Sequence, residues 1–116
     1  MLQPSEIAGI AARALDDKKA KDIKILKTAE QTVLADYFVI CNGTSSTHIK
    51  ALVDAVDKAL NEAGEPLFRR EGLRSDIWVL MDFGSVIVHV FTEEARQFYN
   101  LERLWSDSEE VDLSSL

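Results

Sequence analysis

Cysteine and histidine are scarce in this sequence, and both shortages narrow its chemistry. The single cysteine, Cys41, cannot form an internal disulfide, which favours a reducing compartment over secretion. It stands in an apolar run, where a free cysteine usually behaves as a small buried hydrophobe. The two histidines, His48 and His89, lack the His-x-x-x-His spacing of a helical metal site. We therefore expect structural roles for all three, and no catalytic or metal-binding residue.

Long apolar runs are also missing, and basic residues nearly vanish from the last third of the chain. No apolar stretch approaches the roughly 20 residues that span a bilayer. The N-terminus resembles neither a secretory signal nor a transit peptide, so we expect a cytoplasmic protein. Of the net charge of −7, most belongs to residues 82–116, which hold 8 acids against Arg96 and Arg103.

This charge distribution bears on the type of partner. A protein that mainly binds phosphates needs a basic stripe, so direct nucleic-acid binding, sequence-specific binding included, is disfavoured. Charge complementarity favours a cationic protein partner instead. An acidic surface that only keeps the protein soluble is the alternative, and charge alone leaves it open.

The chain has the length of one domain, and 47% of its 116 residues are hydrophobic, enough to bury a core without disulfides or metal. We expect a single domain over residues 1–106. Asp107–Leu116 contains four acids and few packing residues. This composition predicts an acidic, disordered tail.

Apolar spacing predicts two amphipathic helices in the first half. The first is capped by Ser5 and ends near Asp16–Lys19. The second runs from about Thr47 to Ala63, where a glycine and a proline follow. Its inner stripe consists of Ile49, Leu52, Val53, Val56, Leu60 and Ala63.

Four segments read as strands: Asp22–Leu26, Val33–Cys41, Trp78–Met81 and Val86–Phe91. Val33–Cys41 is nearly continuous in apolar character, so we place it at the centre of the sheet. Gly84 permits a tight reversal between the last two strands. Leu67–Ser75 reads as a looser connection. The pattern predicts an α+β fold with a mixed sheet flanked by helices.

The third predicted helix follows the last strand. Thr92 offers its hydroxyl as N-cap, and two glutamates occupy the positive end of the helix dipole. Phe98, Leu101 and Trp105 recur at helical spacing and are predicted to form its buried stripe. This helix has more large apolar groups than one narrow face can hold, so some should reach the surface.

These surplus groups predict a binding surface. Aromatic anchors with a charged rim have the composition of interface hot spots. We predict a partner-binding patch made of Trp78, Asp82, Tyr99, Glu102, Leu104 and Trp105. A Trp105 that simply caps the core is the alternative, because tryptophan is often only partly buried.

Two stretches, Asp36–Ser46 and Trp78–Trp105, resemble the ribosomal silencing factor family, also called Iojap-like, in their order and spacing. The resemblance covers roughly residues 5–106. It implies a mixed sheet flanked by helices, related in topology to minimal nucleotidyltransferases. It also implies binding to the large ribosomal subunit through the fourteenth protein of that subunit, which is basic, and a steric block of subunit joining that represses translation. It implies a homodimer in solution and no cofactor.

The topological kinship makes a nucleotidyltransferase-like enzyme the natural rival. Such enzymes place a Gly-Ser turn before a helix and two carboxylates two residues apart on a strand, because they hold metal ions against a triphosphate. Gly43, Thr44 and Ser45 imitate the turn, but no predicted strand carries the carboxylate pair. We therefore interpret Thr44 and Ser45 as helix caps. A dimeric scaffold for another basic partner is the third possibility.

Overall fold

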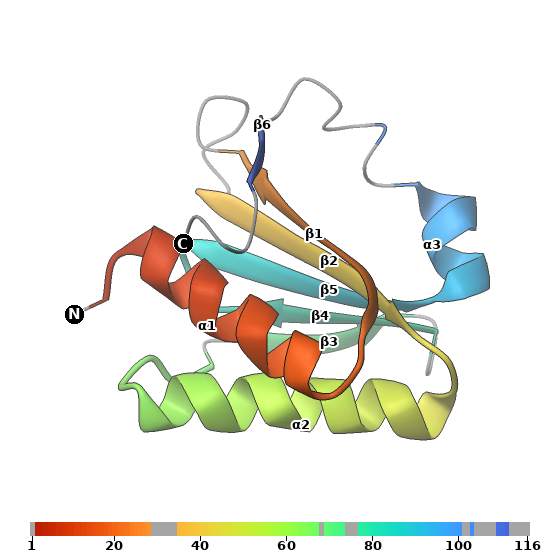
Figure 1. Cartoon of the computed structure of the whole chain (residues 1–116), viewed down its shortest axis with the longest axis horizontal. Helices are drawn as coiled ribbons and strands as arrows, with labels where there is room; N and C mark the ends of the chain where they lie inside the picture. The colour runs from red at the N-terminus through yellow and green to blue at the C-terminus, as the bar shows by residue number, and fades with distance from the viewer. Residues whose placement is uncertain are drawn as a thin grey trace.

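Two long helices, α1 (Pro4–Asp17) and α2 (Ser46–Glu62), lie side by side on one face of a six-stranded sheet (Figure 1). This computed structural model describes residues 2–28, 35–67, 69–73, 77–100, 103 and 109–111. The layered arrangement confirms the predicted α+β class.

The sheet is mixed, and its strands follow the order β3-β4-β5-β2-β1-β6. Its central pair, β2 and β5, is parallel, whereas every other neighbouring pair is antiparallel. The strands are β1 (Lys21–Lys27), β2 (Tyr37–Gly43), β3 (Arg69–Leu73), β4 (Trp78–Asp82), β5 (Val86–Thr92) and β6 (Glu109–Val111). The predicted central position of the apolar strand is confirmed, because all but the first residue of β2 are buried.

Capping explains where both long helices begin. The Oγ of Ser45 accepts a hydrogen bond from the backbone N–H of His48 at 3.1 Å, which makes Ser45 the N-cap of α2. The predicted Ser5 cap of α1 is wrong. The N-cap is Gln3, whose backbone N–H donates to Glu6 Oε1 at 3.0 Å.

The predicted stripe of α2 faces the sheet and α1, except for Ala63, which is the C-cap of the helix and is exposed. Its large members are at most 2% exposed and pack on the strand side chains of the same face. At the entrance to α2, a Cβ on Gly43 would lie 2.9 Å from Ile49 Cγ1, so only glycine allows this close approach. The buried members are Ile49, Leu52, Val53, Val56 and Leu60.

Two strands were not predicted. Strand β3 lies within the segment read as loose, and it pairs with β4 so that Arg69 faces Asp82. Strand β6 lies within the predicted disordered tail, and it pairs with β1 so that Val111 faces Ile25. Val111 also packs against the core under the helices. Glu109–Val111 therefore belong to the sheet, unlike our expectation for them.

Two other boundaries differ from prediction. Strand β2 begins at Tyr37, after Ala35 and Asp36, while residues 29–34 lie outside the described part of the chain. Helix α3 (Glu93–Tyr99) starts after the predicted cap Thr92, whose Oγ1 accepts from the Ala95 N–H at 3.1 Å. Its C-cap is Asn100, which adopts a left-handed conformation with φ of 46°.

The hairpin from β4 to β5 forms at the predicted turn. Gly84 has a φ of 87°, which glycine adopts without steric cost. Its N–H donates to Asp82 Oδ1 at 2.8 Å, and the Phe83 N–H donates to the Val86 carbonyl at 2.9 Å. This turn sets the register that places Trp78 opposite Phe91.

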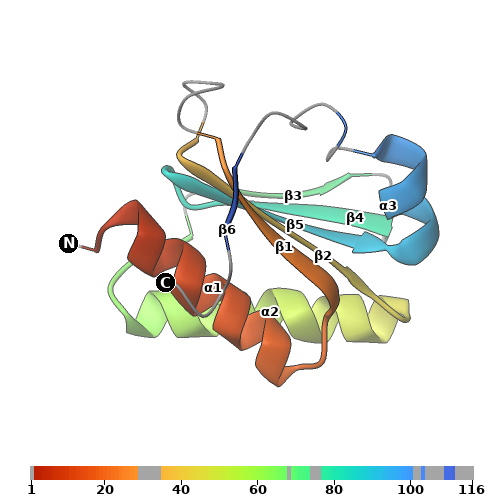
Figure 2. The ribbon, with the colours of Figure 1, turned by 45° about the horizontal axis from the view of Figure 1, so that its top comes forward.

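Strand alternation sorts the side chains of the sheet onto two faces. One face carries Val39, Cys41 and Val88 and is buried under α1 and α2. The opposite face carries Phe38, His89 and other aromatic groups. Figure 2 shows α3 on that side, at the end of β5 and away from the two long helices. Across the described ranges, no helix is long and apolar enough to cross a membrane.

Candidate functional site: an aromatic face of the sheet

Six aromatic rings of the described residues lie in contact on the face of the sheet opposite α1 and α2. Their centroids lie between 4.7 and 6.1 Å apart in successive pairs, within the range of favourable ring contacts. Strands β2, β4 and β5 and helix α3 supply them. We call this group the aromatic cluster; its members are Phe38, Trp78, His89, Phe91, Phe98 and Tyr99.

Trp78 contacts three other rings of the cluster, those of His89, Phe91 and Tyr99. Its ring stacks on that of Phe91, its direct partner across the β4–β5 ladder, at a centroid distance of 5.0 Å. The Tyr99 ring lies against it at 4.7 Å, tilted by 43°. Trp78 and Tyr99 are half-buried, whereas Phe91 is fully buried. The structure thus brings together two of the predicted patch residues and leaves part of each accessible.

His89 forms the polar contact at the base of the cluster. The indole N–H of Trp78 donates to His89 Nδ1 at 3.2 Å. Because Nδ1 accepts, the ring hydrogen resides on Nε2, which is buried and has no hydrogen-bond partner within the described residues. Burial lowers the pKa of His89 from 6.5 to about 4, so the imidazole is neutral at physiological pH. The predicted structural role fits this environment.

The prediction for Phe98 is wrong. We expected it on the buried stripe of the third helix, yet the residue is 79% exposed. Its neighbour Tyr99 turns inward onto Trp78, and the two helix rings meet edge to face at 5.0 Å. The stripe was drawn for a helix that continues to Trp105, whereas α3 ends at Tyr99. Phe98 is therefore an exposed aromatic group that the sequence reasoning missed.

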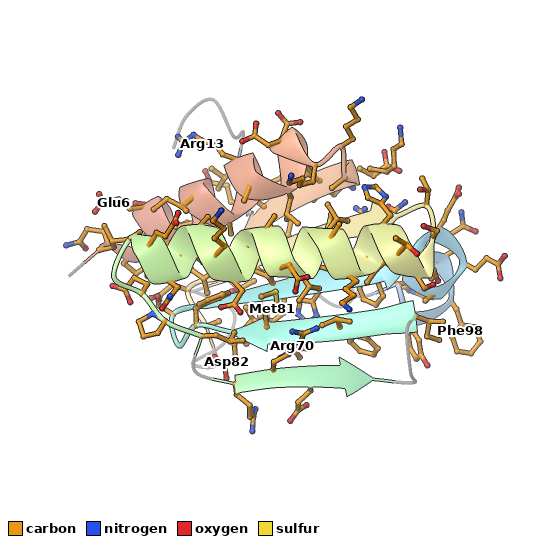
Figure 3. The ribbon with its side chains drawn as sticks, turned by 90° about the horizontal axis from the view of Figure 1, so that it is seen from below. Glu6, Arg13, Arg70, Met81, Asp82 and Phe98 are labelled. Carbon is orange, nitrogen blue, oxygen red and sulfur yellow. The ribbon has the colours of Figure 1, made fainter. Side chains whose placement is uncertain are left out.

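Asp82 lies apart from the cluster. It ends the strand that Trp78 begins, so about 13 Å of extended backbone separates the two residues. Its Oδ2 lies 3.8 Å from Arg69 Nη2 on β3. Figure 3 shows Asp82 and Phe98 near opposite ends of the sheet. The other predicted patch residues, Glu102, Leu104 and Trp105, lie outside the described residues.

Two other acidic groups lie on the helix that carries Tyr99. Glu93 and Glu94 are exposed in the first turn of α3, the helix that carries Tyr99. They also border a cleft of about 570 Å³ at the ends of β2 and β5, together with Asp22 and Thr44. Helix α3 therefore carries both acidic and aromatic side chains on its exposed surface.

Buried Arg96 holds α3 against the sheet. Its guanidinium donates to the side-chain oxygen of Asn42 at 2.8 Å and to the backbone carbonyl of Asp22. Both acceptors lie where β1 and β2 meet the base of α3. In the sequence Arg96 is recognisable only as a charged residue, and no spacing indicates this role.

The turn before α2 offers little to a phosphate. The backbone N–H of Thr44 donates to His48 Nδ1 at 3.0 Å, and Ser45 Oγ is occupied as the helix cap. Ser45 is therefore a helix cap as predicted, whereas Thr44 contacts the ring of His48 and is not the N-cap of α2. Among the described residues, no group of three or more His, Cys, Asp or Glu side chains is placed to hold a metal ion.

Cys41 fits the prediction of a buried hydrophobe. It is fully buried on the helix-covered face. Burial raises the pKa of its thiol to about 12, so the nucleophilic thiolate is not populated near neutral pH.

Comparison with known proteins identifies relatives of this chain. The sequence matches the family described as "Ribosomal silencing factor during starvation" over residues 2–116. It is 40% identical to the ribosomal silencing factor RsfS of Bacillus subtilis over 112 residues, which cover 97% of this chain and 95% of that protein. The RsfS of Halalkalibacterium halodurans is 39% identical over 111 residues, with 96% and 95% covered.

The fold agrees as well. A crystal structure of a Chromobacterium violaceum protein superimposes with a TM-score of 0.87 at 39% identity, covering 90% of this chain and 88% of that one. Sequence and fold thus agree over nearly the whole length, and the chain belongs to the ribosomal silencing factor family.

Proposed function

We propose that this protein binds the large ribosomal subunit, blocks its joining to the small subunit and so represses translation without catalysing a reaction. Family membership supports the silencing role. We further propose that the contact is made to the fourteenth protein of the large subunit. The aromatic cluster is the observation that carries this proposal.

The exposure of the cluster supports a docking role. Trp78 and Tyr99 are half-buried, and Phe98 is 79% exposed at the end of α3. Large rings that are held rigidly and remain accessible are the usual anchors of protein interfaces, because their burial removes much apolar area from water at little entropic cost. The cluster therefore has the properties of an anchor site for a protein partner.

Charge supports a basic partner. Residues 82–116 hold 8 acids and only two bases, and Glu93 and Glu94 are exposed on the helix that carries Tyr99. A protein embedded in ribosomal RNA is basic, so the two surfaces would attract one another. Complementary charge mainly accelerates association and fixes orientation.

Co-sedimentation with purified large subunits tests the contact. We expect Trp78→Ala and Tyr99→Ala to weaken binding by about 1–3 kcal/mol, which is about 5- to 150-fold in Kd. Lys58→Ala, on the exposed side of α2, is the matched control and should bind like wild type. If neither aromatic substitution changes the affinity of the folded protein, the docking surface lies elsewhere.

Two residues of the predicted patch outside the described structure are tested in the same assay. Leu104→Ala should weaken binding as the aromatic substitutions do, because we propose it as an anchor. Glu102→Lys should slow association and change its salt dependence more than it speeds release, because charges at an interface rim mainly steer the encounter.

The steric mechanism has a separate readout. A block that depends on occupancy should fail in proportion to lost affinity, so each weakened variant should restore subunit joining in a reconstituted assay. A folded variant that no longer binds large subunits yet still represses translation would contradict the mechanism. If the folded wild-type protein does not bind large subunits at all, a scaffold for another basic partner is favoured instead.

We also propose a homodimer in solution. Strand β3 is an edge strand of the sheet. We propose that its free edge pairs with a second copy of the chain. Sedimentation equilibrium should give twice the monomer mass, and a proline in place of Glu71 should reduce that mass if β3 forms the contact. Monomeric wild type at all concentrations would contradict this proposal.

Two finer expectations also remain proposals. The turn Gly43–Ser45 between central strand β2 and helix α2 supports a topology related to minimal nucleotidyltransferases. Within the described residues, no strand carries two carboxylates two residues apart, so we expect no triphosphate turnover. A cytoplasmic location suits a single buried thiol, and cell fractionation tests it.

A further inference from the structure

Among the described residues, the interior of the aromatic cluster contains one polar contact, between Trp78 and His89. The ring contacts of Trp78 with Phe91 and Tyr99 constrain the plane of the indole. They do not by themselves select which edge of the indole faces outward, because the χ2 torsion of tryptophan is broad and roughly two-fold. The hydrogen bond from the indole N–H to His89 Nδ1, at 3.2 Å, does select it.

The imidazole is itself held in place. His89 is 4% exposed, and its ring lies 5.0 Å from that of Phe38 and 6.1 Å from that of Phe91. The described rings packed on it carry no charge, and burial keeps its pKa far below neutrality. The acceptor that faces Trp78 is therefore rigid and constantly available.

Stability alone gives a poor account of this histidine. Its Nε2–H is buried without a hydrogen-bond partner in the part of the chain that the structure describes. An unsatisfied buried donor is costly, and an apolar side chain of similar size would avoid that cost. A residue that costs stability and still fixes a surface ring has the features of a functional constraint.

We propose that His89 is a positioning residue, which accepts the indole N–H of Trp78 and thereby holds this ring in the orientation that the ribosomal partner binds. The inference rests on the proposed function, because it assigns Trp78 as an anchor. His89 itself does not touch the partner; its contribution passes through Trp78.

Three substitutions at position 89 separate the acceptor from the bulk of the side chain. In His89→Asn, the amide oxygen can lie near the position of Nδ1 and accept the indole N–H. His89→Leu has the same branching without an acceptor. His89→Phe retains a ring without an acceptor. Trp78→Phe removes the donor and retains an aromatic anchor.

Two measurements apply to each variant. The first is the ¹H–¹⁵N resonance of the Trp78 indole, which is distinguished from that of Trp105 because it disappears in Trp78→Phe. The second is the Kd for purified large subunits. We expect His89→Leu and His89→Phe to shift the indole resonance and to weaken binding about three- to tenfold, the worth of one hydrogen bond. His89→Asn should bind within about twofold of wild type.

The double variant decides whether His89 acts through the indole. In the Trp78→Phe background, His89→Leu should change the Kd by less than about twofold, because no N–H remains to be held. An equal loss in both backgrounds would overturn the proposal, and so would an unshifted indole resonance in His89→Leu. If neither acceptor-free variant folds, the imidazole is required by the fold itself, and the proposal is equally overturned.

Binding of Trp78→Ala and His89→Leu to large subunits separates an error in the docking surface from an error in the role of His89. If Trp78→Ala binds large subunits like wild type, the proposed docking surface is wrong. If Trp78→Ala weakens binding while His89→Leu does not, the surface stands and only the positioning role is overturned.

Discussion

The imidazole of His48 donates from Nε2 to the backbone carbonyl of Lys18 at 2.7 Å, across 30 residues of sequence. Lys18 is the C-cap of α1, and His48 lies in the first turn of α2. The Nδ1 atom of the same ring accepts the backbone N–H of Thr44 at 3.0 Å. One side chain therefore joins the end of one helix to the beginning of the next.

Removal of this ring should loosen the junction of the two helices. We expect His48→Ala to lower the free energy of unfolding by about 1–2 kcal/mol, because two backbone groups lose their partners. Urea denaturation measures the change. Thr47→Ala, the exposed preceding residue on α2, is the matched control and should change it by less than about 0.5 kcal/mol. Equal effects would show that the His48 contacts contribute nothing.

His89 should make stability depend on pH in the acid range. Its folded pKa, about 4, lies below the unfolded value of 6.5, so the unfolded chain takes up a proton that the folded chain refuses. The contribution of neutral His89 to the free energy of unfolding is fully present above pH 6.5. It decreases as the pH falls below that value, by up to about 1.4 kcal/mol per pH unit. Below about pH 4 the loss levels off.

The comparison with His89→Phe isolates this contribution. Urea denaturation at several pH values between 7.5 and 4.5 should show a smaller loss of stability in the variant, because residue 89 then binds no proton in either state. Parallel curves for the two proteins would mean that the imidazole is protonated in the folded state within this range.

Phe98 should matter for binding and not for stability. Because Phe98 is 79% exposed, Phe98→Ala removes little buried area and should change the free energy of unfolding by less than about 0.5 kcal/mol. If the ring is an anchor, the Kd for large subunits should rise at least about fivefold. Gln97→Ala, on the same helix and also exposed, is the control. Wild-type binding by Phe98→Ala would exclude this ring from the interface.

Strand β6 should contribute measurably to stability. Removal of residues 107–116 deletes the pairing with β1 and the packing of Val111 on the core. We expect the Tm to fall by about 5 °C or more, which corresponds to on the order of 1 kcal/mol for a domain of this size. Val111→Asp should reproduce most of the loss within the full chain. An unchanged Tm in both variants would show that β6 adds no stability.

The elements that sequence reasoning found share one property: a periodicity that burial imposes. The stripe of α2 faces the core at helical spacing, and Val39–Cys41 is apolar because both faces of the central strand are covered. In these segments the local pattern and the tertiary environment agree. The β4–β5 hairpin was found for a similar reason, because Gly84 marks the turn.

The elements that were missed depend on a partner strand or on where a helix ends. Arg69–Leu73 and Glu109–Val111 are rich in charged residues and become strands by pairing at the two edges of the sheet. The sides of Phe98 and Tyr99 were exchanged because α3 ends early and Trp78 provides the surface against which only Tyr99 packs. Neither the strand pairing at the sheet edges nor the packing on Trp78 can be predicted from the local spacing of apolar residues.

The parallel pairing of β2 with β5 sets a condition on how the chain folds. These strands form the middle of the sheet, yet the whole of α2, β3 and β4 separates them in sequence. Pairing these two strands closes a long loop of chain. The closure costs conformational entropy before any apolar surface is buried. A nascent chain that has not been synthesised as far as Thr92 therefore has strand β2 but lacks a complete β5 to pair with it. We expect native structure to appear late and all at once as the chain emerges from the ribosome.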